Sequence, residues 1–186
     1  AGLLRSTSCG HPAQRESACR EETALTDEIF EHWRSQAVAY GGNLEATTKT
    51  QSAKTLELDA LRRRFAALAP GDDSPMNVLE VGCGNGLNCF ELARSFPEYT
   101  FHGVDYVPEM VAAANAGIGD SEMASRLRFV VGNATEVDRV DVLLDQYDVV
   151  FTDRCLINLD ANALQQQAIL ASSHKVRPGG HLVMIE

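Results

Sequence analysis

Residues 78–86 read VLEVGCGNG, an apolar run that carries one acid, Glu80, and then places glycine at positions 82, 84 and 86. Apolar residues that follow one another without polar alternation are typical of a parallel strand covered on both faces. Glycine adopts positive φ and lets a ligand approach bare backbone. The stretch therefore predicts a buried parallel strand that turns into a helix through a ligand-binding bend.

Four further apolar runs follow this strand, separated by segments with helical character. The runs cover residues 100–104, 127–131, 147–152 and 181–185, and helices are expected at 87–96, 108–116 and 161–176. Strands that alternate with helices build a parallel sheet with helices on both faces. We therefore predict a doubly wound α/β domain over residues 71–186, with a break at Arg177-Pro178-Gly179-Gly180 before the fifth strand.

The residues ahead of this domain divide into two parts. Residues 1–25 show little apolar periodicity and are expected to form a flexible leader. Within residues 26–70, apolar side chains recur every three or four positions over 30–40 and again over 58–68, which indicates two amphipathic helices. The polar stretch 43–52 between them fits either a loop or a frayed helix start.

Composition argues against several classes of function. The chain has 26 Asp and Glu against 16 Lys and Arg, a net charge of -10, so the basic surface required for bulk nucleic-acid binding is not expected. The five cysteines form no C-x-x-C pair and have no histidine at zinc-ligand spacing, so we expect neither a disulfide scaffold nor a metal site. Without an apolar run of about 18 residues, a cytoplasmic protein with no membrane span is predicted.

Polar residues stand where the second and third strands should end, beside the glycine bend. Asp105 can accept both hydroxyls of a ribose, or it can cap the helix that opens at Pro108. Asn133 offers a donor and an acceptor to a base edge, or it simply favours a turn. Leu87 stands where the nicotinamide fingerprint G-x-G-x-x-G needs its last glycine, and Glu80 would repel a pyrophosphate. A dinucleotide is therefore disfavoured.

Five motifs resemble, in content and order, those of the class I S-adenosylmethionine-dependent methyltransferases. They are EVGCGNG (80–86), GVDYVPEM (103–110), FVVGNA (129–134), YDVVFTDR (147–154) and RPGGHLV (177–183). The resemblance covers residues 75–186. It implies a Rossmann-like sheet that lacks the family's last two strands, a helical lid at residues 26–70, S-adenosylmethionine as cofactor and S-adenosylhomocysteine as product.

The resemblance also implies roles for individual residues. The glycine bend lines the methionine part of the cofactor, Asp105 binds its ribose, and Asn133 with Ala134 borders the adenine, where the family more often has Asp. Glu80 favours the cationic ammonium and sulfonium, directly or through water. Tyr106 and Met110 pack on the adenine, with core packing as an equal alternative for Met110. The expected cofactor-binding set is Glu80, Gly82, Cys83, Gly84, Asn85, Gly86, Asp105, Tyr106, Met110, Asn133, Ala134, Asp153 and Arg154.

The end of the fourth strand bears on the acceptor. Residues 152–159 read TDRCLINL, without the N-P-P-aromatic run of enzymes that methylate base amines, and they resemble small-molecule methyltransferases. Asp153 is a cofactor contact or a base, and Arg154 steers an anionic acceptor, with a salt bridge as the alternative for either. Tyr40, Arg154 and Ile157 are the candidate acceptor contacts. We identify no catalytic base, and a nucleophilic acceptor needs none, because the sulfonium is an activated leaving group and alignment supplies most of the rate.

Two other functions remain open at this point. One is a cofactor-binding or regulatory module without turnover, and the other is a nucleotide-dependent oxidoreductase. The expected partners are a small-molecule acceptor and, through an uncovered sheet edge, a second copy of the chain.

Overall fold

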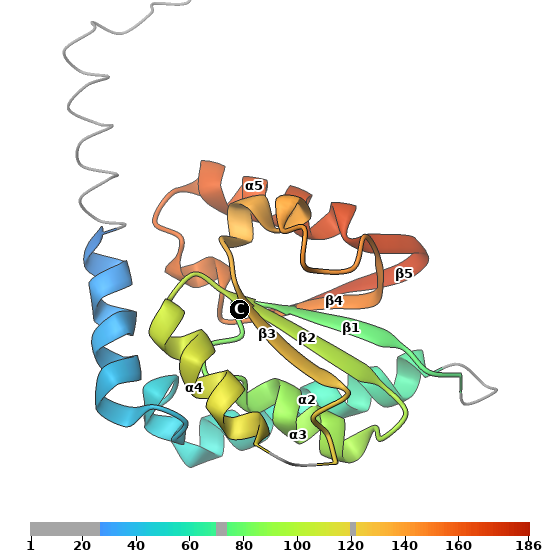
Figure 1. The fold of residues 1–186 in the computed structure, drawn as a ribbon. Coiled ribbons are helices and arrows are strands. Elements are labelled where there is room, and N and C mark those ends of the chain that lie inside the picture. Colours follow the sequence, from blue (N-terminus) through green and yellow to red (C-terminus); the bar gives the residue numbers. More distant parts are fainter. Residues whose placement is uncertain (1–26, 70–73, 120–121) are drawn as a thin grey trace, which may run out of the picture.

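Five parallel strands form one sheet in the computed structural model, which describes residues 27–69, 74–119 and 122–186 (Figure 1). In chain order they are β1 (Asn77–Val81), β2 (Thr100–Asp105), β3 (Leu127–Val131), β4 (Tyr147–Asp153) and β5 (Val176–Ile185). Across the sheet their order is β3-β2-β1-β4-β5. The order reverses between β1 and β4, the place where open α/β sheets bind ligands. The predicted doubly wound, Rossmann-like sheet is confirmed.

Helices cover both faces of the sheet (Figure 1). The described α-helices are α2 (Gln51–Leu68), α3 (Leu87–Ser95), α4 (Pro108–Ile118) and α5 (Asn162–His174), with an earlier helix over residues 27–40. The 3-10 helices are η1 (Leu44–Ala46), η2 (Ala134–Arg139) and η3 (Leu156–Asn158). The expected leader, residues 1–25, lies outside the described residues. Among the described residues, no helix has the length and apolar character to cross a membrane.

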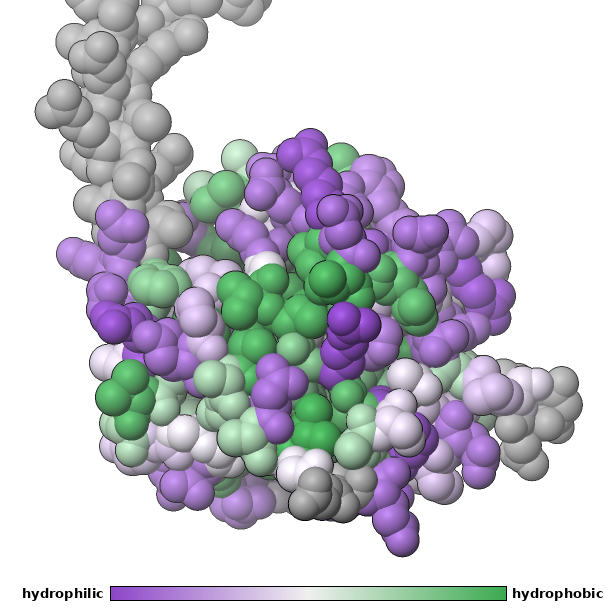
Figure 2. Space-filling view, in the orientation of Figure 1, coloured by the Kyte–Doolittle hydropathy of each residue, from purple (hydrophilic) through white to green (hydrophobic). Residues whose placement is uncertain are grey.

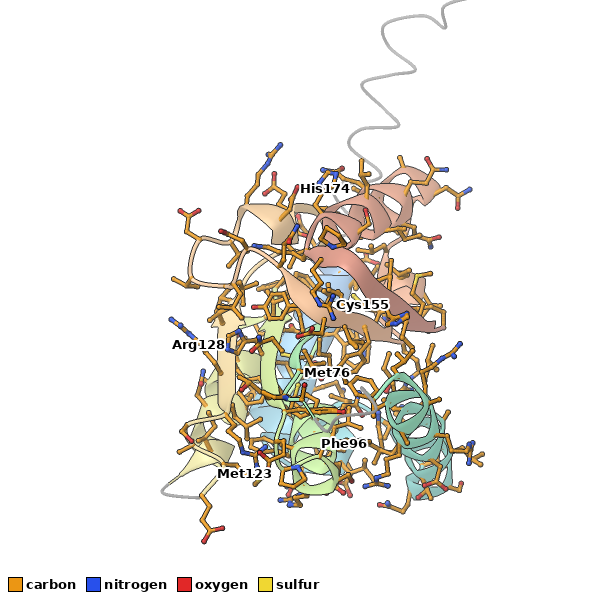
Figure 3. All side chains as sticks on the ribbon, turned by 90° about the vertical axis from the view of Figure 1, so that its right-hand side faces the viewer. Met76, Phe96, Met123, Arg128, Cys155 and His174 are labelled. Carbon is orange, nitrogen blue, oxygen red and sulfur yellow. The ribbon has the colours of Figure 1, made fainter. Side chains whose placement is uncertain are left out.

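The larger core lies between the sheet and the layer formed by α2, α3 and α4. Phe65 of α2 is fully buried and packs its ring against Phe101 of β2 and Phe151 of β4, with ring centroids 6.2 and 5.6 Å away. Met76 is buried in the same core, and Phe96 packs against it. Figure 3 labels both residues in a view turned by 90°. α5 and η2 close the opposite face through Ala171 and Val137. The continuous apolar strands are thus explained by cover on both sides.

The fifth strand differs from the prediction. The segment 177–180 is no break, because β5 already begins at Val176 and pairs there with Tyr147. The next pair is Val149 with His181, so one residue of β4, Asp148, faces four residues of β5, 177–180. Pro178 has no N–H to donate and Gly179 has φ +78°, so the extra residues form a bulge at an edge strand, where such residues are tolerated.

Both edges of the described sheet carry exposed apolar side chains. Val131 on β3 is 51 % exposed and Met184 on β5 is 47 % exposed. Figure 2 shows apolar surface gathered on the face that Figure 1 turns toward the viewer, framed by polar surface. Self-association through an open edge stays a prediction.

Truncation of Phe65 tests the larger core. Phe65→Ala should lower the free energy of unfolding by about 3–5 kcal/mol, because it removes a buried ring and leaves a cavity. Leu56→Ala is the matched control on the same helix, where the side chain is 69 % exposed, and should change stability by less than about 0.5 kcal/mol. Urea denaturation measures both. Equal effects would contradict the assignment of Phe65 to the core.

Candidate functional site

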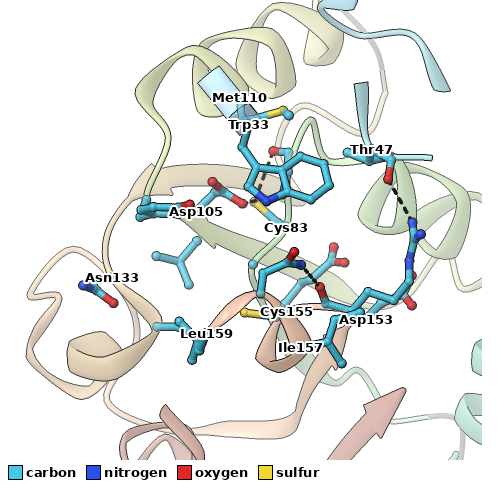
Figure 4. A pocket seen from close by; sticks show the side chains of 18 of the residues that line it. Trp33, Thr47, Cys83, Asp105, Met110, Asn133, Asp153, Cys155, Ile157 and Leu159 are labelled. Carbon is cyan, nitrogen blue, oxygen red and sulfur yellow. Dashed lines mark hydrogen bonds between the residues drawn. The ribbon is translucent and has the colours of Figure 1, made fainter. Parts of the chain in front are cut away.

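A cavity of about 410 Å³ lies at the carboxyl ends of the strands, beside the β1–β4 switch point (Figure 4). The helix at residues 27–40 contributes Ile29 and Trp33 to its wall. The size suits a small molecule. The lining includes every residue of the expected cofactor set except Gly86: Glu80, Gly82, Cys83, Gly84, Asn85, Asp105, Tyr106, Met110, Asn133, Ala134, Asp153 and Arg154.

The glycine bend is fastened to the end of β2. The amides of Gly82 and Cys83 donate to the Val104 carbonyl at 2.8 and 3.0 Å. Asp105 Oδ2 accepts from the Gly84 amide at 2.8 Å, and its Oδ1 accepts from the Val107 amide at 2.9 Å. Asp105 therefore fixes the bend that borders the cavity and also holds Val107, the residue before α4, but its side chain does not cap the helix as the alternative expected.

Two positions of the bend require glycine, each for a different steric reason. At Gly82, with φ +76°, an added Cβ would lie 2.5 Å from Cys155 Sγ, so the bend can pass the end of β4 only without a side chain. At Gly86, with φ +80°, a Cβ would lie 2.7 Å from the Phe129 ring. Gly86 is buried behind the cavity wall, where it lets α3 begin against β3.

The residues expected near an adenine have partners of their own. Asn133 Oδ1 accepts from the Thr135 amide at 3.0 Å, so its side chain caps η2 as the turn alternative predicts. The Tyr106 ring packs edge-on against Phe30, and burial raises the pKa of Tyr106 to about 12. Met110 is 2 % exposed in a cluster with Ala37. Met110 thus lines the cavity and belongs to the core at once.

A buried polar network forms the cavity wall between α2, α3 and β4. Lys54 Nζ donates to Asp153 Oδ2 at 2.8 Å and to Asn88 Oδ1 at 3.1 Å. Asn88 Nδ2 donates to the same Asp153 oxygen at 2.9 Å and to Glu80 Oε1 at 2.7 Å. Lys54 is only 4 % exposed, so its charge is compensated inside the protein.

The sequence prediction missed Lys54 and Asn88, both of which line the cavity. For Lys54 a signal was present. The buried stripe of α2 runs through Leu58 and Phe65, and a step of four residues back from Leu58 reaches Lys54. A lysine on the apolar face of a helix indicates a buried partner.

Arg154 is held in a strained conformation at the end of β4. Its φ of +55° is unusual for a residue with a side chain. Its Nε lies 3.1 Å from Glu57 Oε1, and one of its terminal nitrogens donates to the Thr47 carbonyl at 3.0 Å. Arg154 therefore forms a salt bridge, as the alternative to a role in steering the acceptor predicted. Its contacts join β4 to α2 and to the segment after η1. Strain of this kind is concentrated at functional sites.

The two remaining acceptor candidates differ in position. Ile157, on η3, is 58 % exposed and lines the cavity. Tyr40, at the end of the helix at residues 27–40, is 43 % exposed and is not part of the lining. The geometry thus brings Ile157, but not Tyr40, to the cavity.

Glu80 is buried beneath this network. It is 1 % exposed, and besides Asn88 it accepts from the Cys89 thiol, with Sγ 3.1 Å from Oε2. Burial raises the pKa of Glu80 to about 8, and the hydrogen bonds from Asn88 and Cys89 oppose the shift only in part. At neutral pH the group is therefore mostly protonated when no ligand is present.

This protonation makes stability depend on pH. Between about pH 5 and pH 8 the folded chain holds a proton at Glu80 that the unfolded chain has lost, so the free energy of unfolding should fall as pH rises. Glu80→Gln stays neutral and should fall less steeply over the same range. Urea denaturation at several pH values measures both slopes, and identical slopes would show that Glu80 titrates normally.

Comparison with known proteins places the chain among methyltransferases. A family model described as a methyltransferase domain matches residues 72–186. The chain is 30 % identical over 182 residues to an uncharacterized 37.1 kDa protein in transposon TN4556 of Streptomyces fradiae, covering 96 % of this chain and 48 % of the relative. It is 29 % identical over 132 residues to demethylmenaquinone methyltransferase of Deinococcus radiodurans, covering 71 % and 52 %.

A solved structure shares the fold. The amino pentose methyltransferase CalS10 of Micromonospora echinaspora, with S-adenosylmethionine bound, superposes with a TM-score of 0.55 at 23 % identity, covering 74 % of this chain and 57 % of that chain. The chain spans about half the length of the curated relatives named above.

Proposed function

This chain belongs to the methyltransferase-domain family, and we propose that it binds S-adenosylmethionine and transfers its methyl group to a small-molecule acceptor, leaving S-adenosylhomocysteine. The observation that best supports this proposal is the glycine bend in the cavity wall, which is hydrogen-bonded to Asp105 at the switch point of the sheet. We place the enzyme in the cytoplasm.

The wall of the cavity suits the parts of this cofactor. Asp105 is only 8 % exposed, and a carboxylate that accepts from backbone amides keeps acceptor capacity for a ribose hydroxyl. Burial raises the pKa of Asp105, whereas the amides of Val107, Gly84 and Tyr106 lower it by favouring the carboxylate. A dinucleotide would bring a pyrophosphate toward the acid-bearing wall at Asp153, which disfavours it.

The acceptor and the lid follow from the outer part of the cavity. Ile29, Trp33 and Ile157 offer apolar surface there, so we propose that an acceptor with an apolar portion enters beside them. Residues 26–70 act as the lid, because Asn85 Nδ2 in the glycine bend donates to the Gly41 and Asn43 carbonyls at 3.1 and 2.8 Å. No base is assigned, since alignment with an activated methyl group supplies most of the rate.

Binding of S-adenosylhomocysteine is the first test. Trp33 is the only tryptophan of the chain and lines the cavity, so its fluorescence should change saturably as the ligand is added. Isothermal titration should give the same affinity, and NAD⁺ should give no saturable heat. Saturable binding of NAD⁺ with none of S-adenosylhomocysteine would favour the oxidoreductase.

Turnover separates an enzyme from a binding module. With labelled S-adenosylmethionine, the proposal expects methyl transfer to at least one metabolite of a pooled small-molecule extract. Tight cofactor binding without transfer to any metabolite in the pool would favour the regulatory module.

Asp105→Asn tests the ribose contact. The loss of one charge-assisted hydrogen bond should weaken S-adenosylhomocysteine by about 1.5–3 kcal/mol, roughly 10- to 150-fold in Kd. Asp145→Asn is the control, because this exposed acid precedes β4 at the opposite end of the strand. Isothermal titration measures both variants. Unchanged affinity in Asp105→Asn would remove Asp105 from the ribose site.

A further inference from the structure

The outer part of the cavity has apolar side chains on two sides. Ile29 and Trp33 come from the helix at residues 27–40, and Ile157 comes from η3. In the view of Figure 4 the Trp33 indole lies on the opposite side of the cavity from Ile157. Ile157 is 58 % exposed, so apolar surface remains there for a ligand to bury. We call the space between Trp33 and Ile157 the outer slot.

The outer slot is separate from the place proposed for the nucleoside. Asp105 and Asn133, the proposed ribose and adenine contacts, stand at the carboxyl ends of β2 and β3. In Figure 4 Asn133 lies far to one side of the view, and Ile157 lies toward the other. The two sides of the slot come from a helix ahead of the sheet and from η3, which are not strands. A cofactor that lies along the strand ends therefore leaves the slot for the acceptor.

Contacts within the protein hold the Trp33 indole in place. Its side chain packs against the buried cluster that contains Met110 of α4. The His32 ring meets the indole edge-on, with ring centroids 5.0 Å apart. A salt bridge of 2.8 Å between Arg34 and Glu109 joins the same helix to α4. A flat ligand thus finds a flat surface that is already ordered, which lowers the entropy cost of binding.

The indole of Trp33 also carries a hydrogen-bond donor that is available to a ligand. Within the described part of the chain, Trp33 Nε1 donates to no acceptor. An indole N–H can only donate, and a tryptophan that becomes buried usually finds an acceptor for it. The slot therefore favours a ligand with an oxygen or nitrogen lone pair.

Charge contributes little to recognition in the outer slot. Lys54 and Arg154, the basic side chains of the described cavity lining, are paired with Asp153 at 2.8 Å and with Glu57 at 3.1 Å. Asp160 also lines the cavity and has an interaction partner within the protein. The exposed apolar surface and the indole N–H are the groups of the slot that a ligand can use, and both suit a neutral ligand.

We propose that the outer slot selects acceptors with a flat aromatic ring that bears a hydrogen-bond acceptor group, and that Trp33 is the specificity-determining residue. The ring lies between the indole and Ile157, and the indole N–H donates to an oxygen or nitrogen on the ring. Aromatic pairs are stabilised beyond the area that they bury, whereas a puckered saturated ring cannot lie flat on the indole. This inference rests on the proposed function and adds the chemical class of the acceptor.

1-Naphthol and 1-decalol test the selection. Both have the same bicyclic carbon frame and one hydroxyl group, but only 1-naphthol is flat and aromatic. Each is titrated by isothermal calorimetry into the chain saturated with S-adenosylhomocysteine, so that the cofactor part of the cavity is filled. 1-Naphthol should bind saturably and at least about fivefold more tightly than 1-decalol. Burial of apolar surface alone would not give this preference, because 1-decalol is at least as apolar.

Variants of Trp33 separate the flat face from the N–H. Trp33→Leu removes both and should weaken 1-naphthol at least about tenfold, with 1-decalol and S-adenosylhomocysteine within about twofold. Trp33→Phe keeps a flat face, so it should weaken 1-naphthol only about two- to tenfold and keep the preference over 1-decalol. Tyr40→Leu is the matched control, because this aromatic residue of the same helix lies outside the lining and should affect no ligand.

The outcomes separate the inference from the proposed function. If the unaltered chain does not bind S-adenosylhomocysteine, the proposed function fails and the inference falls with it. If it binds S-adenosylhomocysteine but does not prefer 1-naphthol to 1-decalol, the inference is overturned while the proposed function stands. Equal weakening of S-adenosylhomocysteine and 1-naphthol in Trp33→Leu would show that the indole covers the cofactor, and this also overturns the inference. Should circular dichroism show that Trp33→Leu does not fold, the two probes on the unaltered chain and on Trp33→Phe still decide.

Discussion

The site depends on the hydrogen bonds that the Asp105 carboxylate accepts from backbone amides. It receives the Gly84 amide on one oxygen and the Val107 amide on the other, so a single side chain fixes both the bend after β1 and the start of α4. Hydrogen bonds to an ionised acceptor are stronger than neutral ones, and burial removes the competition from water. The bend, the ends of two strands and the wall of the cavity therefore hold their relative positions before a ligand arrives.

Charged side chains next to this bend form a second set of contacts. Lys54 of α2 reaches Asp153 at the end of β4, while Arg154 reaches Glu57 and the Thr47 carbonyl. These contacts connect the segment before the sheet to the switch point, so the helices ahead of β1 are part of the site as well as cover for the sheet. Because removal of one partner leaves a charge unpaired in a buried place, each member of this set depends on the others.

The sequence was sufficient for features that local pattern encodes. Apolar runs located all five strands, with ends within two residues for the first four, and the glycine bend with Asp105 located the cavity. The bulge at 177–180 could not be predicted from the sequence, because it depends on the register between β4 and β5. The apolar stripe of α2 indicates that Lys54 has a buried partner, but it does not identify Asn88 and Asp153, which are distant in sequence. Gly86 of the expected cofactor set lies outside the cavity lining, and an added Cβ there would meet Phe129 of β3, a neighbour that the sequence does not reveal.

Amide hydrogen exchange tests the central claim most directly, since it reports on the bend itself. The account predicts that saturating S-adenosylhomocysteine slows exchange in residues 82–86 and 105–107 and in the end of β4, while the distant N-terminal ends of the strands stay unchanged. Binding that leaves these segments unprotected, with protection elsewhere on the chain, would contradict the account.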